Sequence, residues 1–431
     1  MDFGLSQDQQ ILRDAVARCL ADTSPLEHVR ECAGRDNPLS DTIFGALHDL
    51  AVPAMLVPEE HGGLGMTLLD AAVVAEQLAY AVTPAPFLAS VVLAPIALSE
   101  AGTNKQKCQW LPKIARGEAR IGVAISATVQ ARDGAGVQFA EGKLSGTALF
   151  CLDFEGADAY LVADAGGRLH LVPALASGLK ATRLTTIDRT RSVGELSFAA
   201  VETDPLADDG GTASARLRDA GRVILAADSL GAGQAMIEKA VDYAGQREQF
   251  GRPIGSFQAV KHMCAEMAAR HEPCRALVWY AAHVFDALPE DASLAACHAK
   301  SLTGDVHRFV ARTATEVHGG MGFIEDTGAA QFVRDVRVTA IYEGTNGIQA
   351  MDLVGRKMMD QGDAAFRLID EIQTAAESAR AARPVDASVE GRLDKDFLTL
   401  TTPEKTFGAV TLQLGKDAGM WASRMRDLNC G

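Results

Sequence analysis

The spacing of hydrophobic positions changes twice along the chain, and these changes predict its domains. Up to about residue 120, and again after about residue 206, apolar residues recur every three or four positions, as on the buried side of a helix. Between these parts, short segments rich in Val, Leu, Thr and Phe alternate with Gly and Asp turns, which is typical of strands. The pattern predicts a mainly α protein with an inserted β domain. The expected parts are an N-terminal helical domain (1–120), a middle antiparallel, barrel-like β domain (121–205), a C-terminal four-helix bundle (206–360) and a helical tail (361–431).

The N-terminal part contains three segments with helical spacing and one glycine-rich turn. Ser6 is suited to the N-cap of the first segment, which runs from about residue 5 to 20. The others cover 44–56 and 68–80, and between them lies Pro-Glu-Glu-His-Gly-Gly-Leu-Gly at 58–65. This turn lacks the preceding strand and the following lysine of a phosphate-binding P-loop. We interpret it as a tight connection between helices.

The middle and C-terminal parts differ in period. Strands are expected at 123–128, 143–145, 159–163, 169–172 and 195–199. Three long helical stripes follow, at about 223–244, 260–285 and 294–317, as in an antiparallel bundle. Pro273 falls in the second stripe and should kink that helix. Five histidines of the bundle lack a consistent metal-binding spacing, so we expect no metal site and interpret them as bundle residues: His262, His271, His283, His298 and His307.

Composition limits the classes of function. The chain has 431 residues, 48% of them hydrophobic and 23% charged, as expected for a globular protein. A net charge of −15 argues against nucleic acid or an anionic membrane surface as the main partner. The eight cysteines include no Cys-x-x-Cys pair, the N-terminus resembles no signal peptide, and no apolar run is long enough to span a bilayer. These features predict a cytoplasmic protein with reduced cysteines.

One carboxylate is placed as a general base would be. Glu343 follows an apolar approach, 336–341, and precedes Thr345 and Asn346, two residues suited to begin a helix. Partial burial in such a turn raises the pKa of a carboxyl group toward neutral, which suits a general base. The spacing by itself favours a simpler interpretation, a surface glutamate in the first turn of a helix.

Three further segments combine charge with glycine or aromatic residues. At 247–258, an Arg beside an aromatic, at a helix end closed by Gly251, can hold a pyrophosphate or simply form a C-cap and a turn. At 316–322, paired glycines expose backbone N–H groups to an anion, or end a helix. At 219–222, Asp-Ala-Gly-Arg places Arg222 on a bundle helix, where it is most simply a solvated charge.

Several of these segments resemble the flavin-dependent acyl-CoA dehydrogenases, in the order found in that family. Ile-Tyr-Glu-Gly-Thr-Asn-x-Ile-Gln at 341–349 resembles their catalytic signature. Arg-x-x-Phe-Gly-x-x-Ile-x-x-x-Gln at 247–258 resembles the element that grips the adenosine end of FAD. The middle domain departs from the family: the Glu-Pro and Gly-Ser-Asp parts are missing after Ser126, Phe150 stands in for a Trp and Leu152 for a Thr.

The resemblance implies a role for each matching residue. Glu343 would be the general base that removes the α-proton of an acyl-CoA thioester, because Gly221 occupies the place where some members carry their base. The expected contacts to FAD are Ser126, Arg247, Glu248, Gln249, Phe257, Gln258, Glu316, Gly319, Gly320, Thr345 and Gly347. The expected contacts to the substrate are Asp219, Arg222, Tyr342 and Gly344.

The activity that the resemblance implies is oxidation of an acyl-CoA to the trans-2-enoyl-CoA. Electrons would pass from FAD to an electron-transfer flavoprotein, in fatty acid metabolism and lipid degradation. Because the family grips FAD across a subunit interface, we expect a homotetramer or dimer, or a heterotetramer with a paralogous subunit. Two alternatives stay open: an acyl-CoA oxidase, and a half-site or non-catalytic subunit of a heteromeric dehydrogenase.

Overall fold

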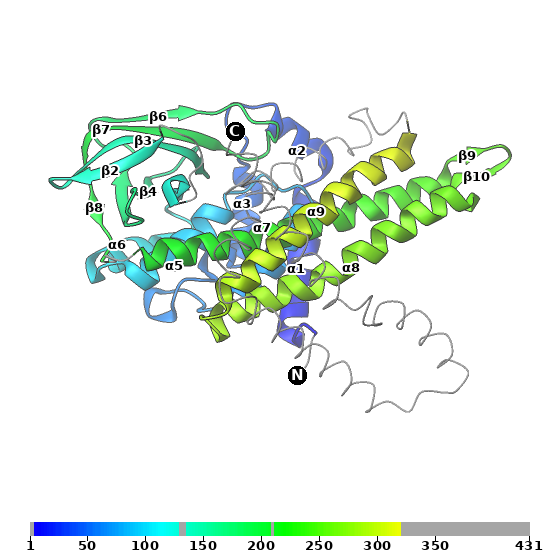
Figure 1. The fold of residues 1–431 in the computed structure, drawn as a ribbon, viewed down its shortest axis with the longest axis horizontal. Helices are drawn as coiled ribbons and strands as arrows, with labels where there is room; N and C mark the ends of the chain where they lie inside the picture. Colours follow the sequence, from blue (N-terminus) through cyan, green and yellow to red (C-terminus); the bar gives the residue numbers. More distant parts are fainter. Residues whose placement is uncertain (1–3, 129–134, 208–210, 320–431) are drawn as a thin grey trace, which may run out of the picture. The chain divides into compact units, whose positions relative to one another are not determined.

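The computed structural model describes residues 4–128, 135–207 and 211–319, and its N-terminal part is helical (Figure 1). The first helix begins after Ser6, whose hydroxyl accepts the backbone N–H of Gln9, while the Gln9 side chain accepts the N–H of Ser6. This capping box confirms the predicted helix start. The helices of this part are α1 (Gln7–Thr23), α2 (Leu26–Ala33), α3 (Asp41–Asp49), α4 (Leu68–Tyr80), α5 (Ala94–Ala101) and α6 (Asn104–Ala115), with the short helical turns η1 (Val52–Ala54), η2 (Glu59–His61) and η3 (Leu88–Leu93).

The glycine-rich segment at 58–65 is a tight turn between helices, as predicted. Gly62 and Gly65 have φ angles of 83° and 57°, which glycine adopts without steric strain. A Cβ at Gly63 would lie 1.9 Å from the carbonyl oxygen of Val57, so no larger residue fits there. The three glycines therefore serve the turn itself.

The middle part of the described chain forms one eight-stranded sheet, at the upper left of Figure 1. Its strand order is β6-β7-β3-β1-β4-β5-β8, with β2 paired to β3, and every described pair is antiparallel except β1 with β4. The strands are β1 (Ile121–Ala124), β2 (Gly136–Ala140), β3 (Lys143–Leu152), β4 (Ala159–Ala163), β5 (Leu169–Pro173), β6 (Leu179–Arg183), β7 (Val193–Glu202) and β8 (Asp204–Pro205), and the turn η4 (Ser126–Thr128) follows β1.

The prediction of an inserted β domain is confirmed, but the sheet is not closed into a barrel. Closure needs two edge strands that pair along their length. One edge here, β8, has only two residues, and the other, β6, is exposed along most of its length. The predicted strands do not include β2 or β6, because neither alternates clearly between apolar and polar residues.

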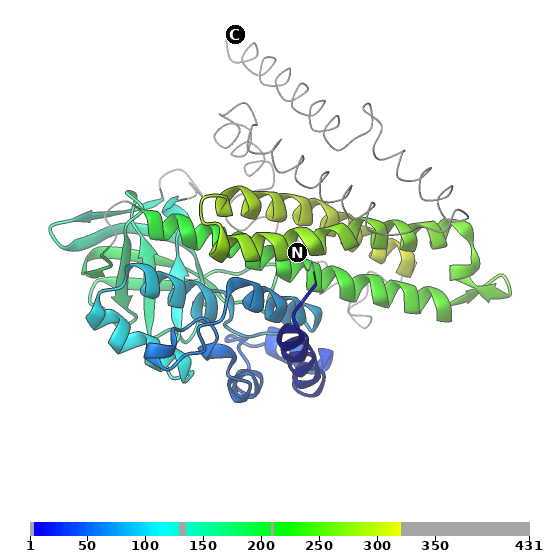
Figure 2. The same cartoon turned by 90° about the horizontal axis from the view of Figure 1, so that it is seen from below.

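Three long helices pack lengthwise after the sheet (Figure 2), which confirms the predicted C-terminal bundle. They are α7 (Thr212–Gln246), α8 (Gln258–Ala287) and α9 (Ala292–His318). Most of α7 is buried because it packs against α4 as well as against α8 and α9. Pro273 lies within α8, which continues through it rather than being interrupted.

One hydrophobic core joins the three parts of the described chain. It includes Leu98 of α5, Leu161 of β4, Val223 of α7 and Phe285 of α8. The sheet is therefore packed onto the helices and not connected to them by linkers alone. No helix in the described ranges is long and apolar enough to cross a membrane.

A hairpin joins α7 to α8 and projects from the end of the bundle (Figure 1). Its strands are β9 (Glu248–Gln249) and β10 (Arg252–Pro253). Phe250 and Gly251 form the turn, with φ angles of 54° and 75°. The prediction that Gly251 closes the helix is wrong, because α7 already ends before Arg247. The two-residue turn needs positive φ at both positions, and this is the role of the glycine.

Candidate functional site

Six of the predicted site residues lie outside the described ranges. They are Gly320, Tyr342, Glu343, Gly344, Thr345 and Gly347. The predicted tail, 361–431, lies outside them as well. Glu343 as the base therefore stays a prediction, and the described residues show only the surroundings in which a cofactor and a thioester would bind.

The sheet brings Ser126 next to the strand that carries Phe150. The Ser126 hydroxyl accepts the backbone N–H of Leu149 at 3.0 Å, and a hydroxyl that accepts one hydrogen bond can still donate its own proton. The Phe150 ring is 45% exposed, whereas Leu152 is buried in the core. An exposed aromatic ring is suited to stack on a planar ligand such as a flavin. Leu152, at the position where the family has a Thr, therefore packs in the core and offers no hydroxyl.

Asp219 and Arg222 are buried together on α7. Arg222 is 3% exposed, and its Nη1 lies 3.0 Å from Asp219 Oδ1 and 3.2 Å from Cys297 Sγ on α9. Ser293 of α9 donates to the same Asp219 oxygen at 3.3 Å. The interpretation of Arg222 as a solvated helix charge is therefore wrong, because α9 covers this face of α7. The contacts described for this pair lie within the protein, so the predicted contact of Asp219 and Arg222 with the substrate stays a prediction.

The residues predicted to hold adenosine gather at the hairpin. Of Arg247, Glu248, Gln249, Phe257 and Gln258, all but Phe257 are exposed. The guanidinium carbon of Arg252 lies 4.0 Å from the ring centroid of Phe257, and Phe250 meets the same ring edge-on at 6.2 Å. Phe250 itself is 93% exposed. Exposed aromatic rings and guanidinium groups are suited to stack on and pair with a nucleotide.

The end of α9 carries the predicted pyrophosphate loop. Gly319 has a φ of 58°, and a Cβ there would meet no atom of the described residues within 4 Å, so these residues leave the backbone open to an anion. Glu316 Oε1 lies 3.1 Å from Nε of Arg312 on the same helix. Both side chains of this ion pair are largely exposed, so it screens the charge of Glu316 only weakly, and contact of Glu316 with a pyrophosphate stays a prediction.

The sheet residues and the hairpin residues do not lie together within one chain. The sheet domain meets α7 where Arg191 pairs with Asp228, and the hairpin follows the last residue of α7, Gln246. About 27 Å of helix separates Asp228 from Gln246. Figure 1 and Figure 2 both place the sheet and the hairpin toward opposite ends of α7.

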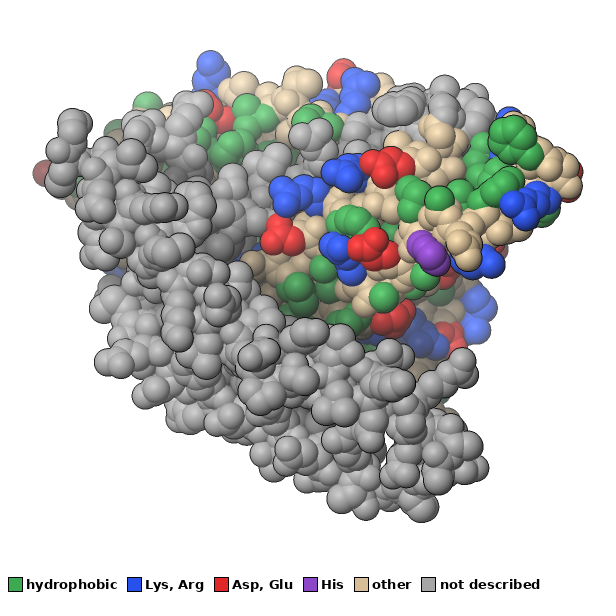
Figure 3. All heavy atoms as spheres, turned by 45° about the vertical axis from the view of Figure 1, so that its right-hand side comes forward, with side chains coloured by type: hydrophobic (Ala, Val, Ile, Leu, Met, Phe, Trp, Pro, Cys, Tyr) green, Lys and Arg blue, Asp and Glu red, His purple; other side chains and the backbone are tan. Residues whose placement is uncertain are grey.

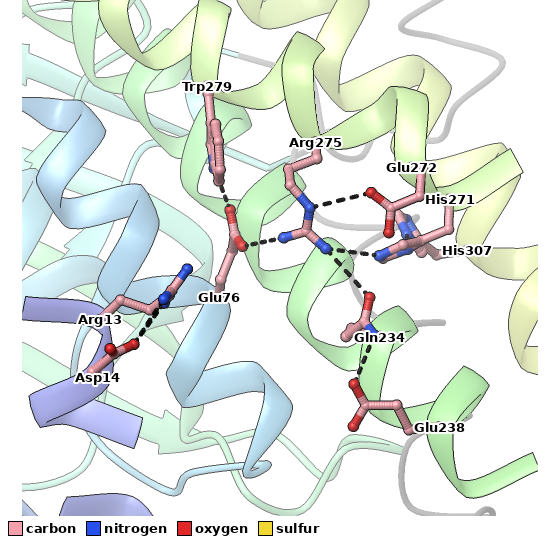
Figure 4. A network of polar contacts seen from close by, with 10 residues as sticks. All are labelled: Arg13, Asp14, Glu76, Gln234, Glu238, His271, Glu272, Arg275, Trp279 and His307. Carbon is pink, nitrogen blue, oxygen red and sulfur yellow. Dashed lines mark hydrogen bonds and ion pairs between the residues drawn. The ribbon is translucent and has the colours of Figure 1, made fainter. Parts of the chain in front are cut away.

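A polar network that the sequence analysis does not identify joins α4 to the bundle (Figure 4). The Glu76 carboxylate accepts from Arg275 Nη1 at 2.9 Å and from Trp279 Nε1 at 2.6 Å. Arg275 Nη2 also lies 3.2 Å from Gln234 Oε1 of α7. Glu76 and Arg275 are 199 positions apart in the sequence, so no local motif predicts the pair.

Burial sets the protonation states of this network. Desolvation raises the pKa of Glu76 to about 7, although the neighbouring Arg275 acts in the opposite direction. Desolvation lowers the pKa of His271 to about 4 and that of His307 to about 3. Both histidines are therefore uncharged at neutral pH. No group of three metal-binding side chains occurs in the part of the chain that the structure describes.

A cavity of about 880 Å³ borders the network, between α1, α4, α7 and α8. Its lining carries both signs of charge, including Glu76, Glu238, Arg13, Lys239 and Arg275. Acidic and basic side chains are also interspersed on the described surface drawn in Figure 3. A mixed lining of this kind favours neither anions nor cations.

A helical domain, an inserted sheet and a helical bundle, in this order, form the fold of the acyl-CoA dehydrogenases. Two family models match the chain. "Acyl-CoA dehydrogenase, N-terminal domain" matches residues 6–118, and "Acyl-CoA dehydrogenase, C-terminal domain" matches residues 208–359. The chain belongs to the acyl-CoA dehydrogenase family, whose members bind FAD and act on acyl-CoA.

Individual relatives agree with this assignment. The acyl-CoA dehydrogenase IpdE2 of Mycobacterium tuberculosis is 30% identical over 316 residues, covering 73% of this chain and 86% of the relative. A chain of the ChsE4-ChsE5 complex from Mycobacterium tuberculosis is similar in structure, with a TM-score of 0.76 and 27% identity over 83% of this chain and 99% of that one. A chain in a structure of the electron transferring flavoprotein of Acidaminococcus fermentans has a TM-score of 0.73 and 27% identity, over 81% of this chain and 98% of that one.

Proposed function

We propose that this chain dehydrogenates an acyl-CoA thioester between its α and β carbons, with Glu343 as the general base. Family membership supplies the class of reaction. The observation that carries the choice of base is the signature at 341–349, in which one carboxylate follows an apolar segment and precedes Thr345 and Asn346, two residues suited to begin a helix. Gly221 of α7 provides no second carboxylate at the alternative position.

Residues of this chain would remove the α-proton of the acyl-CoA and stabilise the charge that forms. Glu343 takes the proton from the α-carbon, and its backbone N–H donates to the thioester carbonyl as enolate charge develops. Tyr342 and Gly344 would contact the thioester, and Asp219 and Arg222, which are joined by a hydrogen bond of 3.0 Å, would position the coenzyme A portion. Bound FAD would supply the acceptor for the β-hydrogen.

Two copies of the chain would hold each FAD. Ser126 and Phe150 suit the ring end, while the hairpin residues Arg247, Phe257 and Gln258 suit the adenosine end. The sheet and the hairpin lie toward opposite ends of α7, so we propose that the hairpin of a second copy reaches the FAD of the first. The smallest such assembly is a dimer, and a homotetramer is our expectation.

We further propose that electrons leave through an electron-transfer flavoprotein in the cytoplasm, in the degradation of fatty acyl chains. The likeness to a chain in the Acidaminococcus fermentans structure supports the first partner. The likeness to a chain of the ChsE4-ChsE5 complex supports a second candidate, a subunit that works beside a paralogue. Purifying the chain alone separates the two, because a homo-oligomeric enzyme should be yellow with about one flavin per chain.

The decisive experiment is anaerobic bleaching of the flavin by a panel of acyl-CoA thioesters with straight, branched and ring-bearing acyl groups. Glu343→Gln should keep its FAD while bleaching slows by about 10²-fold or more, the scale of a lost general base. Glu266→Gln is the matched control, because Glu266 is a half-exposed residue of α8 that pairs with Arg270. Unchanged bleaching in Glu343→Gln would remove Glu343 from the mechanism.

A further inference from the structure

Phe150 lies in a β-bulge, with a backbone conformation that aromatic residues rarely adopt. Ala148 and Cys151 of β3 pair with residues of β7 that are only two positions apart, so two residues of β3 lie opposite one of β7. Within this bulge Phe150 has a φ of 55°. A residue in such a conformation persists only where its surroundings hold it, and such residues cluster at functional sites.

Two side chains hold the strand on either side of this residue. Ser126 Oγ accepts the N–H of Leu149 at 3.0 Å, which satisfies a buried backbone donor that the bulge takes out of the regular ladder. The Asp153 carboxylate accepts the N–H groups of Ala89 and Ser90, at 2.7 and 3.1 Å, in the first turn of η3. The end of β3 is therefore anchored both to η4 and to η3.

Phe150 is the residue of this anchored segment whose side chain reaches the surface. Leu149 and Cys151, the neighbours of Phe150, are buried, whereas Phe150 is 45% exposed. In a regular strand, successive side chains point to opposite faces of the sheet. The extra residue in the bulge interrupts this alternation at Phe150. The bulge thus re-aims a single aromatic side chain out of the domain.

We propose that Ser126 is a positioning residue, which holds the bulge so that Phe150 presents its ring to the flavin. The inference rests on the proposed function and changes the part that Ser126 plays in it. The effect of Ser126 on FAD passes through Leu149 and Phe150, not through a direct hydrogen bond to the cofactor. A backbone that is held in one conformation before binding loses little conformational freedom when the side chain that it carries stacks on a ligand.

A double-mutant cycle on FAD affinity tests this inference. The affinity of the full-length apoprotein is measured by titration with FAD, followed by flavin fluorescence. Ser126→Ala and Phe150→Ala should each weaken binding about tenfold, and the double variant should bind no more weakly than Phe150→Ala. Ser126→Thr keeps the hydroxyl and should bind as the native chain does. Thr128→Ala is the matched control, because that hydroxyl in the same turn contacts only the Ile125 carbonyl among described residues.

Other results of this experiment would contradict either the role of Ser126 or the proposed function, and the two can be told apart. If Ser126→Ala weakens binding equally in the native and Phe150→Ala backgrounds, Ser126 acts on the cofactor directly and the inference is wrong. If Phe150→Ala leaves affinity unchanged in a chain that acyl-CoA bleaches, the inference fails and the proposed function stands. A native chain that binds no FAD contradicts the proposed function. If circular dichroism shows that Ser126→Ala does not fold, Phe150→Trp replaces it in the test. A larger ring at the same bulge should keep FAD bound, and loss of FAD binding in Phe150→Trp would count against the inference.

Discussion

His271 and His307 lie 2.9 Å apart, from Nδ1 of the first to Nε2 of the second, in the buried contact between α8 and α9. His307 Nδ1 lies 2.8 Å from the carbonyl oxygen of Thr303, which can only accept, so this nitrogen carries a proton. His307 Nε2 therefore accepts from His271, and His271 Nε2 accepts from Arg275 at 3.3 Å. Every contact is satisfied when both rings are neutral, and a proton added to either ring removes an acceptor.

Replacing His307 by Asn should flatten the pH dependence of stability in acid. The folded-state pKa values of His271 and His307, about 4 and about 3, lie below the ordinary value of 6.5. Between these values the unfolded chain binds more protons, so native stability falls as the pH is lowered from about 6.5. Removing one such group should reduce the slope of the unfolding free energy by about 1.4 kcal/mol per pH unit. Urea unfolding across this pH window measures the slope.

The comparison must be made between variant and native chain at each pH, because Glu76 acts in the opposite direction. Burial raises its pKa from 4.5 to about 7, so its contribution to stability is complete below pH 4.5 and is lost as the pH rises through 7. His262→Asn, on the exposed side of α8, is the matched control for the substitution itself. An equal slope in His307→Asn and the native chain would contradict the neutral histidine pair.

Gly231→Ala should separate α4 from α7. A Cβ at Gly231 would lie 1.9 Å from the carbonyl oxygen of Glu76, and a backbone atom cannot turn aside as a side chain can. Overpacking of this kind costs about 1–3 kcal/mol, and we expect the upper part of that range. In Gly245→Ala, in the same helix, the new Cβ meets no atom of the described residues within 4 Å, and the variant should be more stable by about 0.5–1 kcal/mol. Opposite shifts in the urea midpoints are the expected result, and equal shifts would exclude the close approach.

Helices with long apolar stripes are the part of this fold that the sequence predicts best. α4 begins at Leu68 and ends at Tyr80, as its spacing indicates, because a stripe repeated over several turns outweighs any single residue. Short or exposed strands such as β6 carry too few alternating positions for the same test. Whether the sheet closes depends on which strands form its edges, and local sequence does not contain that information.

Contacts between distant positions are the part of the candidate site that the sequence could not predict. The residues next to Arg222 in the sequence are those of an ordinary exposed helix charge. Its burial depends on α9, where Cys297, 75 positions away, contacts the guanidinium. The bulge at Phe150 depends on the register between β3 and β7, and no glycine marks its positive φ. By contrast, the hairpin residues are contiguous, so a local motif was sufficient to single out Arg247 and its neighbours.

Phe250→Asn should strengthen the hairpin and weaken assembly. Phe250 has a φ of 54°, which Asn adopts more easily than an aromatic residue, so the turn itself should become more favourable. Its ring is 93% exposed beside Phe257, and losing it removes apolar surface that a second copy would cover. Sedimentation velocity should therefore show a shift toward smaller species at equal concentration, with no loss of thermal stability. Leu175→Asn, which changes a 98% exposed residue after β5, is the control and should leave the sedimentation profile as it is. If Phe250→Asn assembles like this control, the hairpin tip does not take part in the subunit interface.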